Sequence, residues 1–397
     1  MSRAVFLTRV VLENYKSIAR CDVRLGPLNY LVGPNGSGKS NFLDAIGFVA
    51  EALRTSVGAA LRARGGARAI CHAPNVAEGN FSIRLAFCDA EAESGQYTLR
   101  IGRPENNFGV TDWVVQEELL VLGVGGLRGD HASHRPYFAD RLALALVADQ
   151  PAYRKVYEAL TGMWCYNIDP RRIRDETPTD STGTLLSDGS NLAAAFFRLS
   201  FPSREPRERV IEYLRLILPS LREVRSVPVQ YEGTSTEASK RALLFMQRIG
   251  AKTEQNFLPS QMSAGTLRAL GILTALLQPT ESDQPTLVAI EEPEAHVHPA
   301  VLAVLRDAMV EASYRNQILV ATQSADLLDN KDVSADSILA FSADDGVTSI
   351  SGIAEANRDV IRRKLYTPGE LMRIGQLRPE PHVNGSEERL APAGELS

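Results

Sequence analysis

A glycine-rich stretch between a short apolar strand and an amphipathic helix constrains this sequence more than any other feature. The strand is expected over residues 28–32 and the helix follows directly. The residues between and just beyond them are Gly33, Pro34, Asn35, Gly36, Ser37, Gly38, Lys39, Ser40 and Asn41. The glycines permit positive φ and let backbone N–H groups converge on an anion, and the helix N-terminus adds partial positive charge. The stretch therefore predicts a phosphate-binding loop, in which Lys39 reaches the β- and γ-phosphates and Ser40 ligates Mg²⁺.

Composition places this loop in an ordinary globular chain of 397 residues, 44% hydrophobic and 23% charged. No run approaches the ~18 apolar residues of a membrane span, so no membrane association is expected. The beginning of the chain has no signal-peptide core, and its four cysteines are scattered, which favours reduced thiols and a cytoplasmic location. A net charge of −5 argues against a surface that binds polyanions everywhere. Basic groups at 62–68, 171–174 and 362–364 leave local nucleic-acid contact open.

The order of apolar patterns along the chain predicts a mixed α/β fold. Strands are expected at 5–11 and 22–25 as an antiparallel approach to the central sheet, and the helix after the loop is expected to extend to Arg64. Alternating stretches at 81–87, 97–101 and 113–122 predict an antiparallel β-lobe. Further helices are expected at 135–160, 185–199 and 205–221, an irregular basic connector at 165–178, and strands at 224–231 and 242–249 around a polar linker. No heptad repeat is sustained, so a long coiled coil is not expected.

A second group of polar residues follows the apolar run at 286–290. A buried strand that ends in Glu291 and Glu292 complements a phosphate loop, because such sheets gather ligands at the carboxyl ends of their strands. We expect Glu291 to face Ser40 and the Mg²⁺ ion, and Glu292 to polarise a water molecule as general base. The next apolar strand, 317–321, ends in a polar cluster that contains Gln323. His296 and His298 lie nearby without an evident third ligand, so a metal site is not favoured there.

A third motif, Ser263-Ala-Gly265-Thr266, stands at the start of an apolar helix. In isolation Ser263 reads as an N-cap worth about 1 kcal/mol. A serine with glycine amides at a helix N-terminus is equally a second anion site. Two such sites in one chain suggest that one of them closes on the nucleotide of another subunit.

Taken together, these motifs resemble the ABC-type ATPases of the SMC/RecF class, in particular compact single-chain AAA family ATPases. The most specific parts are 14–17, 33–41, 262–266 and 290–299. The resemblance implies a P-loop NTPase fold of ABC/SMC-head type, with a mixed sheet, an antiparallel β-lobe and a helical insertion. The implied divisions are 1–125 for the first part of the head, 126–223 for the insertion, 224–378 for the second part of the head and 379–397 for a disordered tail.

The resemblance also implies a role for the third motif. Ser263, Gly265 and Thr266 form the signature motif, which contacts in trans the triphosphate held by the partner's Lys39. Two ATP molecules are then sandwiched in a head-to-tail homodimer, or in a higher oligomer, that closes on ATP and opens on hydrolysis. Two positions depart from the common pattern of the class. Glu291 replaces the usual aspartate at the Mg²⁺ ion, and Gln323 replaces a switch histidine, so it cannot titrate near neutral pH. We therefore expect slow hydrolysis.

Three functions remain open from the sequence. Relatives of this size often accompany a nuclease or toxin in bacterial anti-phage systems such as Septu and retrons, so the first is an ATPase that regulates a separate effector protein. No nuclease core is evident in the chain itself. The second is a repair-type ATPase that binds DNA ends or branched DNA through residues 62–68. The third is a scaffold that binds ATP without turnover.

Overall fold

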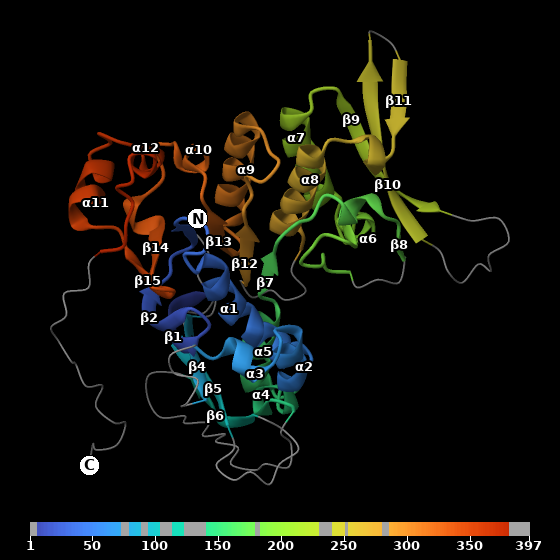
Figure 1. Ribbon diagram of the computed structural model, residues 1–397. Coiled ribbons are helices and arrows are strands. Elements are labelled where there is room, and N and C mark those ends of the chain that lie inside the picture. The colour runs from blue at the N-terminus through green and yellow to red at the C-terminus, as the bar shows by residue number, and fades with distance from the viewer. Residues whose placement is uncertain are drawn as a thin grey trace, which may run out of the picture.

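A mixed six-stranded sheet forms the centre of the molecule. The computed structural model describes residues 6–72, 79–88, 94–103, 113–122, 140–178, 183–229, 240–250, 253–279 and 286–380. The strand order is β15-β14-β3-β13-β12-β7, and all neighbours are parallel except β15 with β14. The strands are β3 (Leu28–Val32), β7 (Trp164–Tyr166), β12 (Leu287–Glu291), β13 (Gln317–Thr322), β14 (Ile338–Asp344) and β15 (Val347–Gly352). Figure 1 shows helices on both sides of this sheet.

Successive side chains of the strands point to opposite faces of the sheet, and each face packs into a different hydrophobic core. On one face Tyr30, Ile290 and Val320 pack with α8 (Ala264–Leu277) and α9 (Pro299–Ala312). On the other face Leu31 and Ala289 pack with α1 (Lys39–Arg54) and the antiparallel sheet. The central strands β3, β12 and β13 are mostly apolar because both of their faces are buried.

The antiparallel β-lobe has the strand order β2-β1-β4-β5-β6. Its strands are β1 (Leu7–Tyr15), β2 (Ile18–Arg24), β4 (Phe81–Cys88), β5 (Ser94–Gly102) and β6 (Val114–Leu122). Gln317, which is fully buried, fastens this lobe to the central sheet. Its amide accepts a hydrogen bond from the Leu7 N–H at 2.8 Å and donates to the Leu7 carbonyl at 2.7 Å and to that of Gly26 at 2.8 Å.

A third sheet and several short helices complete the described part of the chain. Strand β10 (Lys240–Ile249) pairs with β8 (Thr177–Pro178), β9 (Leu221–Val229) and β11 (Thr253–Phe257), and this sheet projects away from the centre (Figure 1). The remaining helices are α2 (Val57–Ala63), α3 (Ala67–Ile70), α4 (Ala143–Leu146), α5 (Pro151–Thr161), α6 (Leu192–Arg198), α7 (Glu205–Ile217), α10 (Ala325–Leu328), α11 (Glu355–Arg362) and α12 (Pro368–Arg373).

Several expectations about single elements were wrong. The helix after the loop ends at Arg54 and a new one starts at Val57, because Ser56 caps α2 by accepting from the Ala59 N–H at 3.1 Å. The helix expected at 185–199 is the shorter α6. The connector expected at 165–178 contains β7, which pairs with β12, and β1 and β2 belong to the β-lobe rather than to the central sheet.

Other expectations lie partly outside the described residues. These are the start of the helical region at 135–139, the polar linker at 232–239 and the tail from 381 onward. The last described residues are still held in place: Glu380 donates its N–H to the Gly352 carbonyl at 3.0 Å and to the Ser351 hydroxyl at 2.7 Å. No helix in the described ranges is both long and apolar enough to cross a bilayer.

Candidate functional site

The phosphate loop joins β3 to α1 with the backbone geometry that a loop of this kind needs. Gly36 and Gly38 have φ values of 76° and 96°, which residues with a Cβ atom rarely adopt. The Lys39 ammonium is turned back onto the loop and donates to the carbonyls of Gly33 at 2.7 Å and Pro34 at 2.9 Å. Burial lowers the pKa of Lys39, while the charges of the three glutamates at 291, 292 and 294 oppose that shift. The lysine charge thus lies close to two carbonyl oxygens and three glutamates.

Close packing behind the loop makes two of its glycines sterically necessary. A Cβ atom at Gly38 would lie 2.1 Å from the Thr348 hydroxyl, and one at Gly33 would lie 2.4 Å from the Phe341 carbonyl oxygen. Thr348 Oγ1 lies 2.7 Å from the Ser17 hydroxyl, which also accepts from the Asn41 amide at 2.6 Å. Ser17, between β1 and β2, and Thr348 of β15 therefore support the loop from behind.

Ser40 and Glu291 meet across the site although 251 residues separate them. The Ser40 hydroxyl donates to Glu291 Oε2 at 2.6 Å. Burial raises the pKa of the Glu291 carboxyl, and the neighbouring charges of Glu292 and Asp44 raise it further, against the hydrogen bond from Ser40. A hydroxyl and a carboxylate in contact are the oxygen donors that Mg²⁺ prefers, so the residues present fit this ion.

Glu292 follows in a strained backbone conformation. Its φ is 45°, and its N–H donates to the Ala321 carbonyl at 2.8 Å, so the chain turns sharply at the end of β12. Buried Arg268 of α8 holds this turn from behind, because its guanidinium donates to the carbonyl oxygens of Glu291 at 3.0 Å and Glu292 at 2.8 Å. A third hydrogen bond joins Arg268 to the Ile168 carbonyl.

Glu294 organises the end of the neighbouring strand β13. Its Oε1 accepts from the Thr322 hydroxyl at 2.9 Å and from the Gln323 N–H at 2.8 Å, while its buried Oε2 has no hydrogen-bond partner among the described residues. The Gln323 residue itself is exposed. Neither Glu294 nor Arg268 was predicted from the sequence as a site residue. The only signal for them was an arginine inside an apolar helix and a third carboxylate after the glutamate pair.

The structure does not bring the third motif onto the phosphate loop of the same chain. The Ser263 hydroxyl caps α8 by accepting from the Thr266 N–H at 3.1 Å. Gly265 lies so close to the turn after β12 that a Cβ atom would come within 2.6 Å of the His296 carbonyl oxygen. Within the described ranges no hydrogen bond or ion pair links residues 263–266 to residues 33–41. His298 caps α9, since its Nδ1 accepts from the Ala300 N–H at 3.2 Å.

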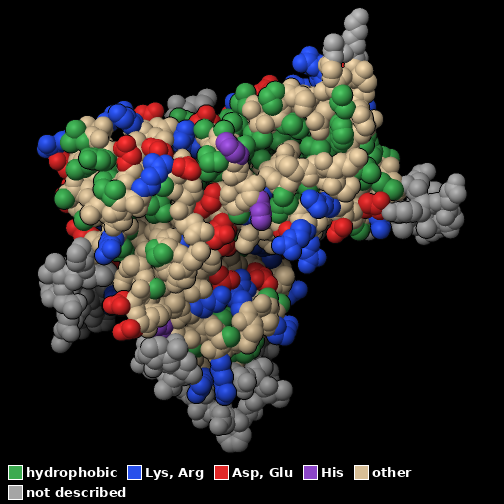
Figure 2. Space-filling view, turned by 45° about the horizontal axis from the view of Figure 1, so that its top comes forward, with side chains coloured by type: hydrophobic (Ala, Val, Ile, Leu, Met, Phe, Trp, Pro, Cys, Tyr) green, Lys and Arg blue, Asp and Glu red, His purple; other side chains and the backbone are tan. Residues whose placement is uncertain are grey.

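Figure 2 shows acidic side chains gathered near the middle of one face, with basic side chains beside them. The arrangement combines a glycine-rich loop at a helix N-terminus, the Lys39 ammonium, a hydroxyl–carboxylate pair and a second carboxylate on a strained turn. A loop and a cation of this kind fit a phosphate group, and the space beside Gly36 is open. This fold and this cluster define a P-loop NTPase head.

Comparisons with known proteins match separate parts of the chain. Residues 183–329 match the family described as "AAA domain, putative AbiEii toxin, Type IV TA system", and residues 6–118 match "RecF/RecN/SMC N terminal domain". The DNA replication and repair protein RecF of Paenarthrobacter aurescens (strain TC1) is 32% identical over 161 residues, 39% of each chain. RecF of Magnetococcus marinus is 45% identical over 62 residues, 15% of this chain and 16% of the relative. The matched region thus spans about two fifths or less of these relatives.

Solved structures agree on the fold. The SmcHead bound to the C-winged helix domain of ScpA superposes with a TM-score of 0.53 at 15% identity, over 89% of this chain and 98% of that one. The Smc head domain with an extended coiled coil, bound to the C-terminal domain of ScpA from Pyrococcus furiosus, gives a TM-score of 0.52 at 13% identity, over 91% and 100%. The predicted ABC/SMC-head fold is confirmed. The matches to two family models over separate parts of the chain, the partial RecF relatives and the SMC-head structures support the resemblance to the ABC/SMC/RecF class of ATPases.

Proposed function

We propose that this chain binds and hydrolyses ATP with Mg²⁺, and that two copies close head to tail on two ATP molecules. In this proposal closure controls a separate effector protein. The observation that carries the proposal is the 2.6 Å hydrogen bond between the hydroxyl of Ser40, on the phosphate loop, and the carboxylate of Glu291, at the end of β12. Two segments far apart in sequence meet there as an oxygen-rich pair beside a loop built for phosphate.

Each residue of the cluster has a distinct task in this proposal. Lys39 exchanges the carbonyls of Gly33 and Pro34 for the phosphates. Ser40 and Glu291 hold Mg²⁺, which supplies positive charge to the phosphate oxygens when bound. Glu292 accepts the proton of the attacking water as general base. Gln323 donates a hydrogen bond to the γ-phosphate without titrating. The remaining loop residues, Gly33, Pro34, Asn35, Gly36, Ser37, Gly38 and Asn41, form or support the cradle.

The dimer follows from the position of Ser263, Gly265 and Thr266. These residues start α8 away from the phosphate loop of their own chain, and their one role in the isolated chain is to cap and pack that helix. A partner's triphosphate gives the remaining N–H groups of this helix start an acceptor. A higher oligomer built from such dimers retains the same contact.

The effector part of the proposal has a different kind of support. The family matched by residues 183–329 is described as including a toxin of a type IV toxin–antitoxin system. A cytoplasmic ATPase that senses infection and releases a nuclease or toxin in antiviral defence agrees with that description. Such a role needs a long-lived ATP-bound state, and the replacement of the switch histidine by Gln323 favours one.

The test is the oligomeric state of the Glu292→Gln variant, with the exposed Glu355→Gln as matched control. Light scattering coupled to size exclusion measures mass with and without ATP and Mg²⁺. We expect Glu292→Gln to form a stable dimer with ATP and to hydrolyse about 10²–10⁴-fold more slowly than the parent. A chain that remains monomeric with ATP contradicts the proposal. If neither the parent nor Glu292→Gln releases phosphate, the chain is a scaffold without turnover, and equal non-zero rates show that Glu292 is not the general base.

A DNA-binding repair ATPase is the second candidate, favoured by the RecF relatives. The structure removes one residue from the expected DNA contact at 62–68. Arg64 is bound within the chain, with Nε 2.7 Å from Asp44 Oδ1 and Nη1 2.6 Å from Glu51 Oε2. Arg171 and Arg172 remain exposed beside the turn that precedes the third motif. Salt-sensitive DNA affinity that rises with ATP, and falls in Arg171→Gln, would support this candidate.

A further inference from the structure

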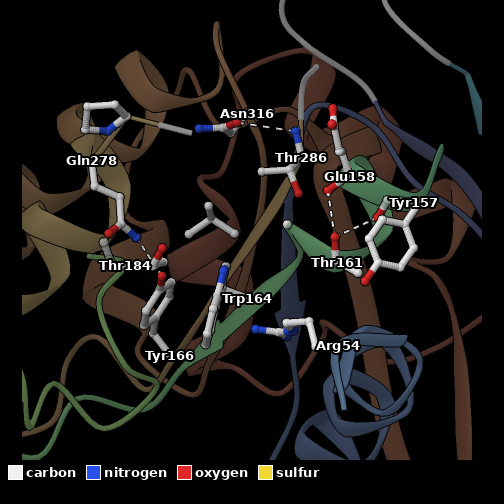
Figure 3. A pocket seen from close by; sticks show the side chains of 14 residues that line it. Arg54, Tyr157, Glu158, Thr161, Trp164, Tyr166, Thr184, Gln278, Thr286 and Asn316 are labelled. Atoms are coloured by element: carbon white, nitrogen blue, oxygen red, sulfur yellow. Dashed lines mark hydrogen bonds between the residues drawn. The ribbon is translucent and has the colours of Figure 1, made fainter. Parts of the chain in front are cut away.

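A cavity lies at the opposite end of the central sheet from the phosphate loop. Its volume is about 390 Å³, at the smaller end of the range for ligand pockets. It is lined by residues from α1, α5, β7, the end of α8 and the start of β12, and Figure 3 shows how their side chains surround it. None of the residues named above for phosphate or Mg²⁺ lines it.

Helices α1 and α8 and strand β12 each have one end at the phosphate loop or beside the turn that follows β12, and each also reaches this cavity. Helix α1 starts at Lys39 and ends at Arg54, a length of about 24 Å at ~1.5 Å per residue. Helix α8 starts beside Ser263, and Gln278 directly after its end lines the cavity. Strand β12 runs from the cavity at Val288 to the site at Glu291. A molecule in the cavity would therefore touch the far end of each element.

A cation without a carboxylate partner faces this space. The Arg54 guanidinium lies 3.9 Å over the Trp164 ring and donates to the carbonyls of Met163 at 3.1 Å and Ala50 at 3.2 Å. No ion pair joins it to an acidic residue in the described part of the chain. Glu51, whose charge acts on Arg54, binds Arg64, and half-exposed Glu158, which lines the cavity, lies 3.8 Å from Arg154. Burial lowers the pKa of Arg54, as expected for a cation short of counter-charge.

Aromatic rings and amides complete the lining. Trp164 and Tyr166 stack with ring centroids 6.2 Å apart, and the Gln278 amide donates to the Tyr166 hydroxyl at 2.6 Å. The Asn316 Oδ1 accepts from the Thr286 N–H at 3.3 Å, which leaves its NH₂ group without an acceptor in the described residues. The indole nitrogen of Trp164 points toward the middle of the lining residues (Figure 3) and likewise has no acceptor there. Arg54, Trp164 and Asn316 thus offer three donors from three different elements.

We propose that this cavity binds a small molecule that combines a planar ring with one anionic group, and that its occupancy is coupled to the nucleotide site. The donors and the arginine select the anion, and the aromatic pair selects the ring. A nucleoside monophosphate is a compound of this kind that the volume admits, and a small aromatic carboxylate shares the same chemistry.

The chain supplies its own probe for a binding test. It has two tryptophans, Trp113 and Trp164, so a Trp113→Phe parent leaves Trp164 as the only one. We would titrate this full-length parent with AMP, GMP, CMP and UMP, with benzoate and nicotinate as the carboxylate arm, and with inorganic phosphate as the compound without a ring. The fluorescence of Trp164 is the signal.

Two variants test the donors. Asn316→Asp keeps the oxygen that accepts from Thr286 but replaces the NH₂ donors by negative charge, so the fold is retained while an anion is repelled. Arg54→Gln removes the cation, with exposed Arg62→Gln as matched control, and thermal melting identifies any variant that fails to fold. We expect saturable binding of at least one ring-bearing anion, at least tenfold weaker binding in Asn316→Asp and in Arg54→Gln, and unchanged binding in Arg62→Gln.

Other outcomes overturn the proposal. Absence of saturable binding by all ring-bearing probes refutes the site. Loss of binding in Lys39→Met shows that the probes occupy the phosphate loop instead, and binding that is indifferent to Asn316→Asp places them elsewhere. Coupling is tested separately: the bound probe should change the dissociation constant of a non-hydrolysable ATP analogue by about fivefold or more, and the analogue should change that of the probe by the same factor. If each dissociation constant is the same with and without the other ligand, the coupling is refuted while the proposed binding site stands.

Discussion

Arg268 offers the sharpest test of how the head holds the turn at Glu292. It is 4% exposed and lies about one turn into α8, from where its guanidinium reaches three backbone carbonyls. Two of these carbonyls belong to Glu291 and Glu292. We propose the substitution Arg268→Met, which keeps an unbranched side chain of similar length and removes the donors and the charge. The exposed Arg315→Met is the matched control.

The expected loss of stability follows from these contacts. Hydrogen bonds from a charged donor contribute about 1.5–3 kcal/mol each to stability. Burying the charge of the guanidinium costs several kcal/mol, which offsets part of that contribution. We expect a net loss of about 3 kcal/mol. Unfolding entropy of ~2.1 cal/mol/K per residue amounts to about 0.8 kcal/mol/K for this chain, so Tm falls by about 4 °C if the head unfolds as one unit. Arg315→Met should change Tm by less than about 1 °C, because surface pairs contribute ~0–1 kcal/mol.

Kinetic measurements distinguish a role of Arg268 in positioning Glu292 from a role in stability alone. Without Arg268 the strained turn at Glu292 loses one of its restraints, and a general base misplaced by about 1 Å costs up to 10²-fold in rate. The phosphate loop is not touched by Arg268. We therefore expect kcat for ATP hydrolysis to fall about 10–100-fold while the affinity for an ATP analogue is unchanged, measured well below the Tm of the variant. If Tm falls and kcat is unaltered, Arg268 is only structural and this reasoning is wrong.

Three further substitutions test other parts of the site. Gly38→Ala places a Cβ 2.1 Å from Thr348 Oγ1 and should weaken ATP binding at least tenfold by calorimetry, whereas Gly36→Ala, with open space around it, should weaken it less. Because burial raises the pKa of Glu291, folding favours its protonated form, and the stability that this form contributes is lost as pH rises through the raised pKa. Glu291→Gln should therefore raise Tm at neutral pH, and it should abolish Mg²⁺-dependent hydrolysis. A lower Tm would contradict this reasoning. Gln323→His should make the hydrolysis rate vary with pH near ~6.5, where the parent profile should be flat; identical profiles would show that this position is remote from the phosphate.

Much of the head could be predicted because its signals are local. The phosphate loop, β3, β12 and β13 were all predicted, since an apolar run followed by glycines or carboxylates reports the strand and the turn in one short window. The break between α1 and α2 was missed, because the cap at Ser56 looks like any other serine in a helical stretch. Strand β7 was missed for a similar reason. Three residues carry too little pattern to show pairing with β12, which lies more than 100 residues away.

By itself the sequence determined the class of this protein: a loop with positive-φ glycines, a lysine and a serine leaves few alternatives, because its chemistry depends on backbone geometry that neighbouring residues impose. Only the tertiary structure decided which distant groups meet. It brings Ser40 to Glu291, sets Arg268 behind the catalytic turn, fastens Arg64 to Asp44 and surrounds a cavity with the far ends of α1, α8 and β12. These contacts join residues that are far apart in the sequence and depend on how the sheets and helices pack. A local sequence pattern therefore cannot predict them.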